Sequence, residues 1–391
     1  MIYAGIDIGK NKHEIGLVNE EGVRLGKSLT FTNTTEGAKR MFAYIHSLIP
    51  KDEKIVICME ATGHYWMALY SFLLKEDLDV VVINPIQSDS FRNFYIRKAK
   101  TDSVDAFLLA EIMRFGNYTK TPLSDEKLAA LRQLSRFRMS MVDTCSSFKC
   151  QAVALLDQVF PEYAALFSDV FGKTSRELLL QFTTPEEILA VDTDKLTGIL
   201  LKVSRGRLGK GKAEEIKQVA KTSFGVTYAK DAFTFQLKLI LEQIQFIEKN
   251  IEELDNKIEK YLSGINDVVT TIPGVGSVLG AIIVSEIGDI SRFNDCSKLV
   301  AFAGLDPSIR QSGEFSGTKN HISKRGSPYL RRAIWTAAMV AAFHDPVFSA
   351  FYQKKRAEGK AYGTAIGAVA RKLTFTIFAV LRDNKPYEVK Q

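Results

Sequence analysis

Apolar residues in the first 85 positions occur in short runs typical of strands, and stretches with helical spacing lie between them. The strand-like runs are 3–9, 13–19, 23–31, 54–60 and 79–84, and the helical runs are 34–49 and 65–75. With a further helix after residue 101, the order is β-β-β-α-β-α-β-α. This is the order of the ribonuclease H-like fold, so we predict an α/β N-terminal domain of that class.

From residue 120 onward the pattern is helical. One long helical run covers 124–160 and ends at Pro161, and interrupted helices fill 162–231. A regular series of apolar residues then follows in steps of three and four: Leu237, Ile240, Ile244, Ile247, Ile251, Leu254, Ile258 and Tyr261. This spacing predicts a coiled-coil seam. The seam would join copies of the chain into a homo-dimer or homo-tetramer, or it would close a helical hairpin within one copy.

The last segment, 265–391, is predicted to be mostly α-helical. Two helical stretches flank the turn at 272–276, which indicates a helix-hairpin-helix, and Ser327 and Pro328 open a later helix as its N-cap and first residue. We therefore expect three parts, 1–155, 156–264 and 265–391.

The composition is that of a globular protein, with 46% hydrophobic and 25% charged residues in 391. Four scattered cysteines and five histidines predict neither a disulfide framework nor a zinc site. We find no signal peptide and no uninterrupted membrane span, so we expect a cytoplasmic protein. From residue 301 onward, 15 Lys and Arg face 6 Asp and Glu, which indicates a surface for a polyanion such as nucleic acid.

Four acidic residues have positions that suit metal chemistry. Asp7 lies on the first strand between Gly5 and Gly9, which we expect to leave room for a ligand, and Glu60 ends the fourth strand. Asp102 and Asp105 lie one turn apart near the start of a helix and so share a face. Together these carboxylates predict a site for Mg²⁺ or Mn²⁺, because two such ions can clamp the oxygens of a phosphodiester.

Several basic or glycine-containing segments are candidates for binding phosphate backbones. The residues are Arg92, Arg97, Lys98, Lys100, Arg205, Arg207, Lys210, Lys212, Gly274, Gly276, Lys319, Lys324, Arg325, Arg331 and Arg332. A Ser/Gly loop at 311–317 lies among the last of these. A serine there is a candidate nucleophile for phosphate, although the same composition is common in surface loops.

These segments resemble one family in two separate blocks. GIDIGK, MEATGHYW and KTDSVDA in residues 1–155 carry the four acids, and TTIPGVGSVLGA, FAGLDPSIRQSG and ISKRGSPYLRRA lie in residues 265–355. Both blocks are similar to the DEDD-type transposases of the IS110 insertion-sequence family, which are related to the Piv DNA invertase.

The resemblance implies a RuvC-like catalytic domain at 1–155, a helical linker with a coiled coil at 156–264, and a transposase domain at 265–391. It implies DNA strand exchange guided by a structured bridge RNA, with a composite site made from the acids of one subunit and a serine of another. The family's serine falls on Ser312, and Ser316 lies in a second Ser-Gly pair nearby. The alternatives are a Piv-like site-specific invertase, a RuvC-like junction nuclease without a covalent step, and an actin-like or sugar-kinase-fold ATPase.

Overall fold

The computed structural model describes residues 1–50, 53–92, 101–116, 125–265, 268–308, 311–312, 315–316 and 321–389. The chain divides into two compact units, Met1–Leu123 and Ser124–Gln391.

The first unit is built on a five-stranded sheet with the order β3-β2-β1-β4-β5. Its strands are β1 (Ile2–Ile8), β2 (Lys12–Val18), β3 (Leu29–Thr32), β4 (Ile55–Glu60) and β5 (Asp79–Ile83). The pairs β1–β4 and β4–β5 are parallel, whereas β1–β2 and β2–β3 are antiparallel. The prediction of a mixed α/β N-terminal region is confirmed, and the RuvC-like assignment stays a prediction.

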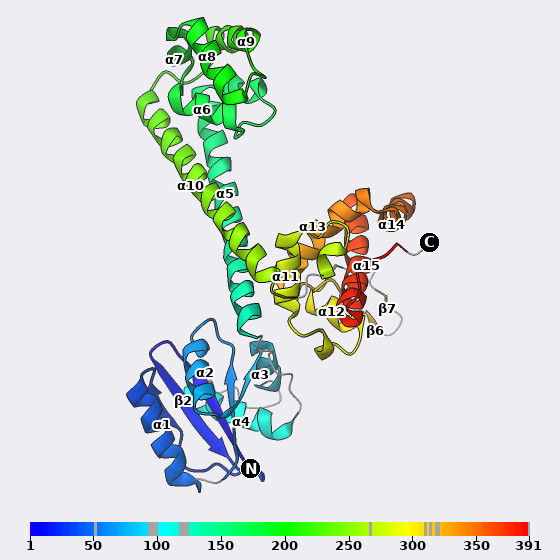
Figure 1. Ribbon diagram of the computed structural model, residues 1–391. Helices are drawn as coiled ribbons and strands as arrows, with labels where there is room; N and C mark the ends of the chain where they lie inside the picture. The colour runs from blue at the N-terminus through cyan, green and yellow to red at the C-terminus, as the bar shows by residue number, and fades with distance from the viewer. Residues whose placement is uncertain are drawn as a thin grey trace. The chain divides into compact units, whose positions relative to one another are not determined.

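Helices cover both faces of this sheet. On one face, α1 (Thr35–Leu48) and α2 (Trp66–Lys75) share a buried core with the strands, and on the other face α4 (Asp102–Phe115) packs against β1 and β2 (Figure 1). The short helix α3 (Pro85–Arg92) follows β5 directly. Thr34 is the N-cap of α1, because its side chain accepts a hydrogen bond from the Gly37 amide.

The predicted strand at 23–31 is too long. Only β3 pairs over several residues, and Arg24 makes a single bridge to Val18. Gly26 lies between them with a positive φ of 75°, and the Tyr44 hydroxyl donates a hydrogen bond to the carbonyl oxygen of Lys27. This turn removes the middle of the predicted strand from the sheet.

The second unit contains two long helices, α5 (Glu126–Val159) and α10 (Lys230–Leu262), which lie side by side (Figure 1). The elements between them are η1 (Pro161–Leu166), α6 (Lys173–Gln181), α7 (Pro185–Ala190), α8 (Thr193–Ser204) and α9 (Lys210–Lys221). In the predicted seam, Leu237, Ile244 and Ile258 are fully buried. Of the two arrangements that the seam allowed, the structure therefore shows the hairpin within one chain.

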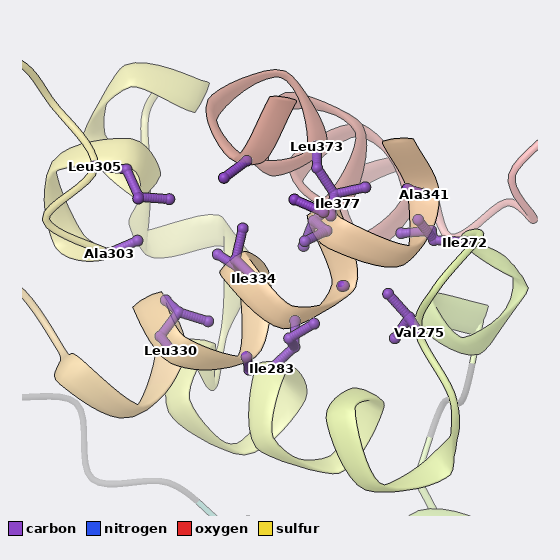
Figure 2. Close-up of a cluster of buried hydrophobic side chains, with 14 of the residues drawn as sticks. Ile272, Val275, Ile283, Ala303, Leu305, Leu330, Ile334, Ala341, Leu373 and Ile377 are labelled. Carbon is purple, nitrogen blue, oxygen red and sulfur yellow. The ribbon is translucent and has the colours of Figure 1, made fainter. Parts of the chain in front are cut away.

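The rest of the second unit is a mostly α-helical domain, as predicted. Its elements are η2 (Val268–Thr271), α11 (Ser277–Ile287), η3 (Ile290–Arg292), α12 (Cys296–Phe302), β6 (Gln311–Ser312), β7 (Phe315–Ser316), α13 (Pro328–His344), α14 (Pro346–Ala357) and α15 (Tyr362–Asp383). Figure 2 shows its core, which includes Leu330 and Ile334 of α13 and Leu373 and Ile377 of α15. The predicted N-cap Ser327 accepts a hydrogen bond from the Leu330 amide.

One described helix, α15, is long and apolar enough to cross a membrane, but half of its most apolar stretch is buried. Its buried residues belong to the core shared with α11 and α13, so we interpret α15 as a core helix.

A buried ion pair fastens α5 to this domain. The Arg136 guanidinium donates to both carboxylate oxygens of Glu286 on α11, at 2.6 and 2.9 Å, and Glu286 is only 4% exposed. Glu286 also accepts a hydrogen bond from Ser327, so one carboxylate connects α5, α11 and the start of α13. Paired and hydrogen-bonded in this way, the buried charge is compensated.

Candidate functional site

Two of the predicted acids lie at one edge of the sheet. Asp7 lies near the carboxyl end of β1, and Glu60 is the last residue of β4. The two strands are adjacent and parallel, with Ile6 opposite Met59. Because the carboxyl ends of adjacent parallel strands meet at the same edge, this topology brings the two carboxylates near each other.

The other two acids come from the first turn of α4. Thr101 caps this helix by accepting a hydrogen bond from the Val104 amide, and both Asp102 and Asp105 follow within one turn. Carboxylates are stabilised at a helix N-terminus, where the unpaired amides carry partial positive charge. Asp105 is buried, at 8% exposure, and Asp102 is exposed.

Gly5 brings α4 close to the sheet. A Cβ atom at Gly5 would lie 2.0 Å from the Ala106 carbonyl oxygen, and one at Gly9 would lie 2.5 Å from the carbonyl oxygen of Lys12. The prediction that these glycines leave room for a ligand is therefore wrong, because helix backbone and a tight turn fill both places. The close approach of α4 carries Asp102 and Asp105 toward Asp7 instead.

The electrostatics of Asp7 show that the four acids interact. Burial, and after it the negative charges of Asp105, Asp102 and Glu60 in that order, together raise the pKa of Asp7 to about 6. We call these four residues the acidic cluster. Within the described parts of the chain, no three acid, imidazole or thiol groups converge as a ready-made metal cage.

Two carboxylates of the acidic cluster are held by neighbouring side chains. Glu60 accepts hydrogen bonds from Thr62, at 2.8 Å, and from the buried hydroxyl of Ser88. Asp105 accepts one from the Arg92 guanidinium at 2.9 Å, and Arg92 also pairs with Asp89. Arg92 therefore neutralises acids in this structure, and its predicted contact with phosphate stays a prediction.

The chemistry of the acidic cluster suits a hard divalent cation, and the four carboxylates would have to move closer together to hold one. All four donors are carboxylates, the ligand type that Mg²⁺ and Mn²⁺ accept. Their mutual repulsion, expressed in the raised pKa of Asp7, is what a bound cation would relieve. The Arg92 guanidinium pairs with Asp105, which shows that this carboxylate accepts a positively charged partner.

Ser88 and Glu14 were not among the predicted site residues. Ser88 is 1% exposed and donates a hydrogen bond to Glu60. The sequence signal for it was a hydroxyl five residues after the end of β5. Glu14 lies opposite Asp7 on β2 and is 9% exposed, but its carboxylate accepts a hydrogen bond from Thr30 on β3. The alternation of β2 could have placed Glu14 on the same face as Asp7.

The predicted basic loop at 205–212 is partly helical, because α9 begins at Lys210. Arg205, Arg207 and Lys210 are exposed, and they have no ion-pair partner among the described residues. Lys212 differs, because its ammonium group pairs with Glu215 at 3.0 Å and lies over the Phe167 ring.

Two arginines near the start of α13 are engaged within the chain. Arg331 donates to the Ala303 carbonyl oxygen at 3.2 Å, and Arg332 makes two 2.7 Å hydrogen bonds with Asp143 of α5. Lys324 and Arg325 are exposed. Of the other predicted nucleic-acid contacts, Arg97, Lys98, Lys100 and Lys319 lie outside the described residues.

In the turn at 272–276, the structure requires glycine at one of the two glycine positions. Gly274 has a φ of 83°, and a Cβ there would lie 2.5 Å from the Ala337 carbonyl oxygen of α13. Gly276 caps α11, and a Cβ at this position would meet nothing within 4 Å. The turn follows a single 3-10 turn, η2, so the helix-hairpin-helix stays a prediction.

Ser312 lies on the short strand β6, which pairs with β7 so that Ser312 is opposite Phe315 and Gln311 is opposite Ser316. Both candidate serines thus belong to one small antiparallel ladder in the second unit. The acidic cluster belongs to the first unit.

Two family models match the chain. Residues 4–161 match a transposase model of DEDD type, and residues 266–353 match the model of the IS116/IS110/IS902 transposase family. Together these models cover well over half of the chain, and they include the acidic cluster and Ser312 respectively.

Full-length relatives agree with the models. The chain is 24% identical to the insertion element IS116 uncharacterized 44.8 kDa protein of Streptomyces clavuligerus, with 98% of this chain and 95% of the relative covered. It is also 24% identical to the mini-circle putative transposase for IS117 of Streptomyces coelicolor, with 93% of this chain and 90% of the relative covered. A pilin gene-inverting protein of Moraxella bovis is 24% identical to the chain, with 99% of this chain and 97% of the relative covered.

Proposed function

The chain belongs to the IS110 family of transposases and is a DNA transposase or recombinase, and from this premise we propose that it cuts and rejoins DNA with the acidic cluster and a serine nucleophile. One observation carries the proposal: Asp7 is half-buried beside Glu60 and the first turn of α4, so that burial and then the charges of Asp105, Asp102 and Glu60 raise its pKa. Acids from β1, β4 and α4 therefore act on one another at a single sheet edge, which we interpret as a RuvC-like catalytic site.

We propose that the acidic cluster holds Mg²⁺ or Mn²⁺. When bound, such an ion would stabilise negative charge that develops on the phosphate oxygens. Ser88 and Thr62 would keep the Glu60 carboxylate oriented through their hydrogen bonds. The Arg92 guanidinium donates to one carboxylate oxygen of Asp105. When an ion binds, Arg92 would either give up this hydrogen bond or keep it while the ion takes the other oxygen.

We propose Ser312 as the nucleophile, with Ser316 as the alternative. The Ser312 hydroxyl oxygen attacks the phosphorus of a DNA phosphodiester, and the bond from phosphorus to the leaving sugar oxygen breaks. The serine proton passes to water, and the leaving oxygen takes up a proton. The phosphate remains an ester throughout, so the reverse attack rejoins DNA without ATP. Lys324 and Arg325 are exposed cations close in sequence that would hold phosphate oxygens.

We propose three partners: donor and target DNA, a structured bridge RNA, and further copies of the chain. Arg205, Arg207 and Lys210 provide free cations for the nucleic acids. The inner seam of α10 is occupied by α5, so a homo-dimer or homo-tetramer would use other surfaces. Phe235, Leu239 and Phe246 are 64%, 45% and 61% exposed and form an apolar stripe on the outer side of α10. This function requires access to the chromosome, so we propose that the protein is located in the bacterial cytoplasm and associates with the nucleoid.

The experiment is strand cleavage of a labelled DNA that carries the element's ends, with the purified chain and its copurified RNA. We expect cleavage with Mg²⁺ or Mn²⁺, none with EDTA, and none with Asp102→Asn. Sequencing the copurified RNA should recover one structured transcript. Cleavage that survives in both EDTA and Asp102→Asn would contradict the role of the acidic cluster.

Relatives that are named pilin gene-inverting proteins favour a second candidate, site-specific inversion. Inversion and transposition share the cleavage chemistry, and they differ in how the ends are arranged. A plasmid that carries two ends in inverted orientation distinguishes them, because an invertase flips the segment between them whereas a transposase moves it.

A further inference from the structure

The first unit has a hollow of about 250 Å³ on the face of the sheet away from α4. Its wall includes His13 of β2, Asn33, Thr34 and Thr35 at the start of α1, and Phe72 of α2. The function proposed above does not use these residues.

His13 is an unusual residue to find in this wall. The side chain is 2% exposed, and neither ring nitrogen has a hydrogen-bond partner among the described residues. Burial lowers the pKa of His13, and the Asn33 side chain, which lies near the ring without reaching hydrogen-bond geometry, opposes this effect only in part. A buried polar group without a partner is costly, and an oxygen-bearing ligand in the hollow would supply one.

The start of α1 contributes further donors to the same hollow. Thr34 caps the Gly37 amide with its side chain and the Ala38 amide with its carbonyl oxygen. Thr35 lines the hollow, and among the described residues neither its amide nor that of the next residue, Glu36, has an acceptor. Free amides at the start of a 14-residue helix attract anions, and phosphate most readily.

These donors lie at the same sheet edge as the acidic cluster. His13 is opposite Ile8, the residue that follows Asp7, and their side chains lie on the face opposite to that of Asp7. A nucleic-acid strand that passes over this edge would present its phosphates to both faces in turn.

We propose that this hollow binds a backbone phosphate of the nucleic acid next to the one that is cut. The ring N–H of His13 and the amides of Thr35 and Glu36 donate to the phosphate oxygens, and the Thr35 hydroxyl adds a fourth donor. The nucleic-acid source of the phosphate rests on the proposed function, whereas the phosphate site itself rests on the geometry of the first unit.

Thr35→Glu tests the proposal, because a carboxylate at the first helical position repels phosphate but suits the helix dipole and should not harm folding. The matched control is Thr193→Glu, at the first position of α8 in the other unit. His13→Phe is the second variant. It removes both ring nitrogens but keeps an aromatic ring, so the protein should melt at a higher temperature.

Binding of a fluorescent DNA is measured by anisotropy in EDTA over a range of salt concentrations, so that cleavage plays no part. We expect Thr35→Glu to weaken binding about fivefold or more and to reduce the salt slope by about one. We expect His13→Phe to weaken binding about three- to tenfold, the effect of one lost hydrogen bond. Thr193→Glu should match the wild type.

A second arm follows thermal unfolding with inorganic phosphate as the added ligand. Stabilisation of the wild type but not of Thr35→Glu, combined with unchanged DNA binding in both variants, would mean that the hollow takes free phosphate and would overturn the nucleic-acid assignment. Wild-type behaviour of both variants in both assays would overturn the site itself. Wild-type protein that binds DNA without cleaving it, with Thr35→Glu still weakening that binding, would refute the proposed function and leave the phosphate site itself standing.

Discussion

The acidic cluster should destabilise the first unit when no metal is bound. Asp7 has a pKa of about 6 in the folded chain against 3.8 for an unperturbed aspartate. Above pH 6 the folded protein must therefore keep Asp7 ionised where burial and three other carboxylates oppose the charge. The full shift corresponds to about 3 kcal/mol. Because Asp7 is partly exposed, solvent screening reduces the expected penalty to about 1–2 kcal/mol.

Replacing Asp7 by Asn removes this charge and keeps the shape of the side chain. At pH 7.5 in EDTA, we expect Asp7→Asn to unfold with a free energy about 1–2 kcal/mol higher than the wild type. The raised pKa means that the penalty applies above about pH 6 and is lost as the pH falls toward 4, where folded and unfolded chains both bind the proton. The difference between the two proteins should therefore shrink over that range. Added Mg²⁺ should stabilise the wild type more than the variant.

The assay is urea unfolding followed by tryptophan fluorescence in a Trp335→Phe background, which leaves Trp66 of α2 as the reporter of the first unit. The matched control is Asp79→Asn at the opposite edge of the same sheet, which changes the net charge equally. We expect the control to alter stability by less than about 0.5 kcal/mol. An Asp7→Asn protein no more stable than the wild type at pH 7.5 would refute the reasoning, because the acids would then not repel one another.

Three further predictions concern packing. Gly5→Ala should lower the free energy of unfolding by about 3 kcal/mol or more and stop cleavage, because the new Cβ would lie 2.0 Å from the Ala106 carbonyl oxygen. The control is Gly198→Ala on α8, whose Cβ would meet nothing within 4 Å and which should stabilise the chain slightly. Thermal unfolding measures both. Glu286→Gln should cost about 1–2 kcal/mol in the same measurement, because it removes the charged partner of Arg136, whose side chain is 41% exposed and can be solvated in part. An unchanged melting temperature would show that the pair contributes nothing. Ile244→Asp should lower the helicity measured by circular dichroism, because Ile244 is fully buried against α5. Phe246→Asp, on the exposed side of α10, should keep the helicity and reduce the mass measured by light scattering. An unchanged mass would place self-association on another surface.

Local patterns predicted most of the first unit correctly. The apolar runs of β1, β2, β4 and β5 are buried on at least one face, and the cap at Thr34 is a property of a few adjacent residues. The strand at 23–31 was wrong because Gly26 takes a positive φ, and apolar periodicity does not report backbone turns of that kind.

The acidic cluster was predicted from strand ends and helix spacing, but its detailed arrangement depends on contacts between distant segments. Gly5 admits the backbone of α4, and Ser88 reaches Glu60 from α3, neither of which is visible from spacing alone. The seam of α10 is a similar case. Its heptads fit a partner copy and an internal helix equally well, and only the position of α5 distinguishes them.

The measurement that tests the central claim most directly is the trapping of a covalent protein–DNA adduct. Labelled DNA is incubated with the chain, its RNA and Mg²⁺, quenched in denaturant, separated by denaturing electrophoresis, and the DNA-linked peptide is identified by mass spectrometry. We predict a phosphoserine link on Ser312, absent from Ser312→Ala, retained by Ser316→Ala, and absent whenever Asp102 is replaced by Asn. Efficient cleavage without any adduct would contradict the account and would identify a junction nuclease that uses water as its nucleophile.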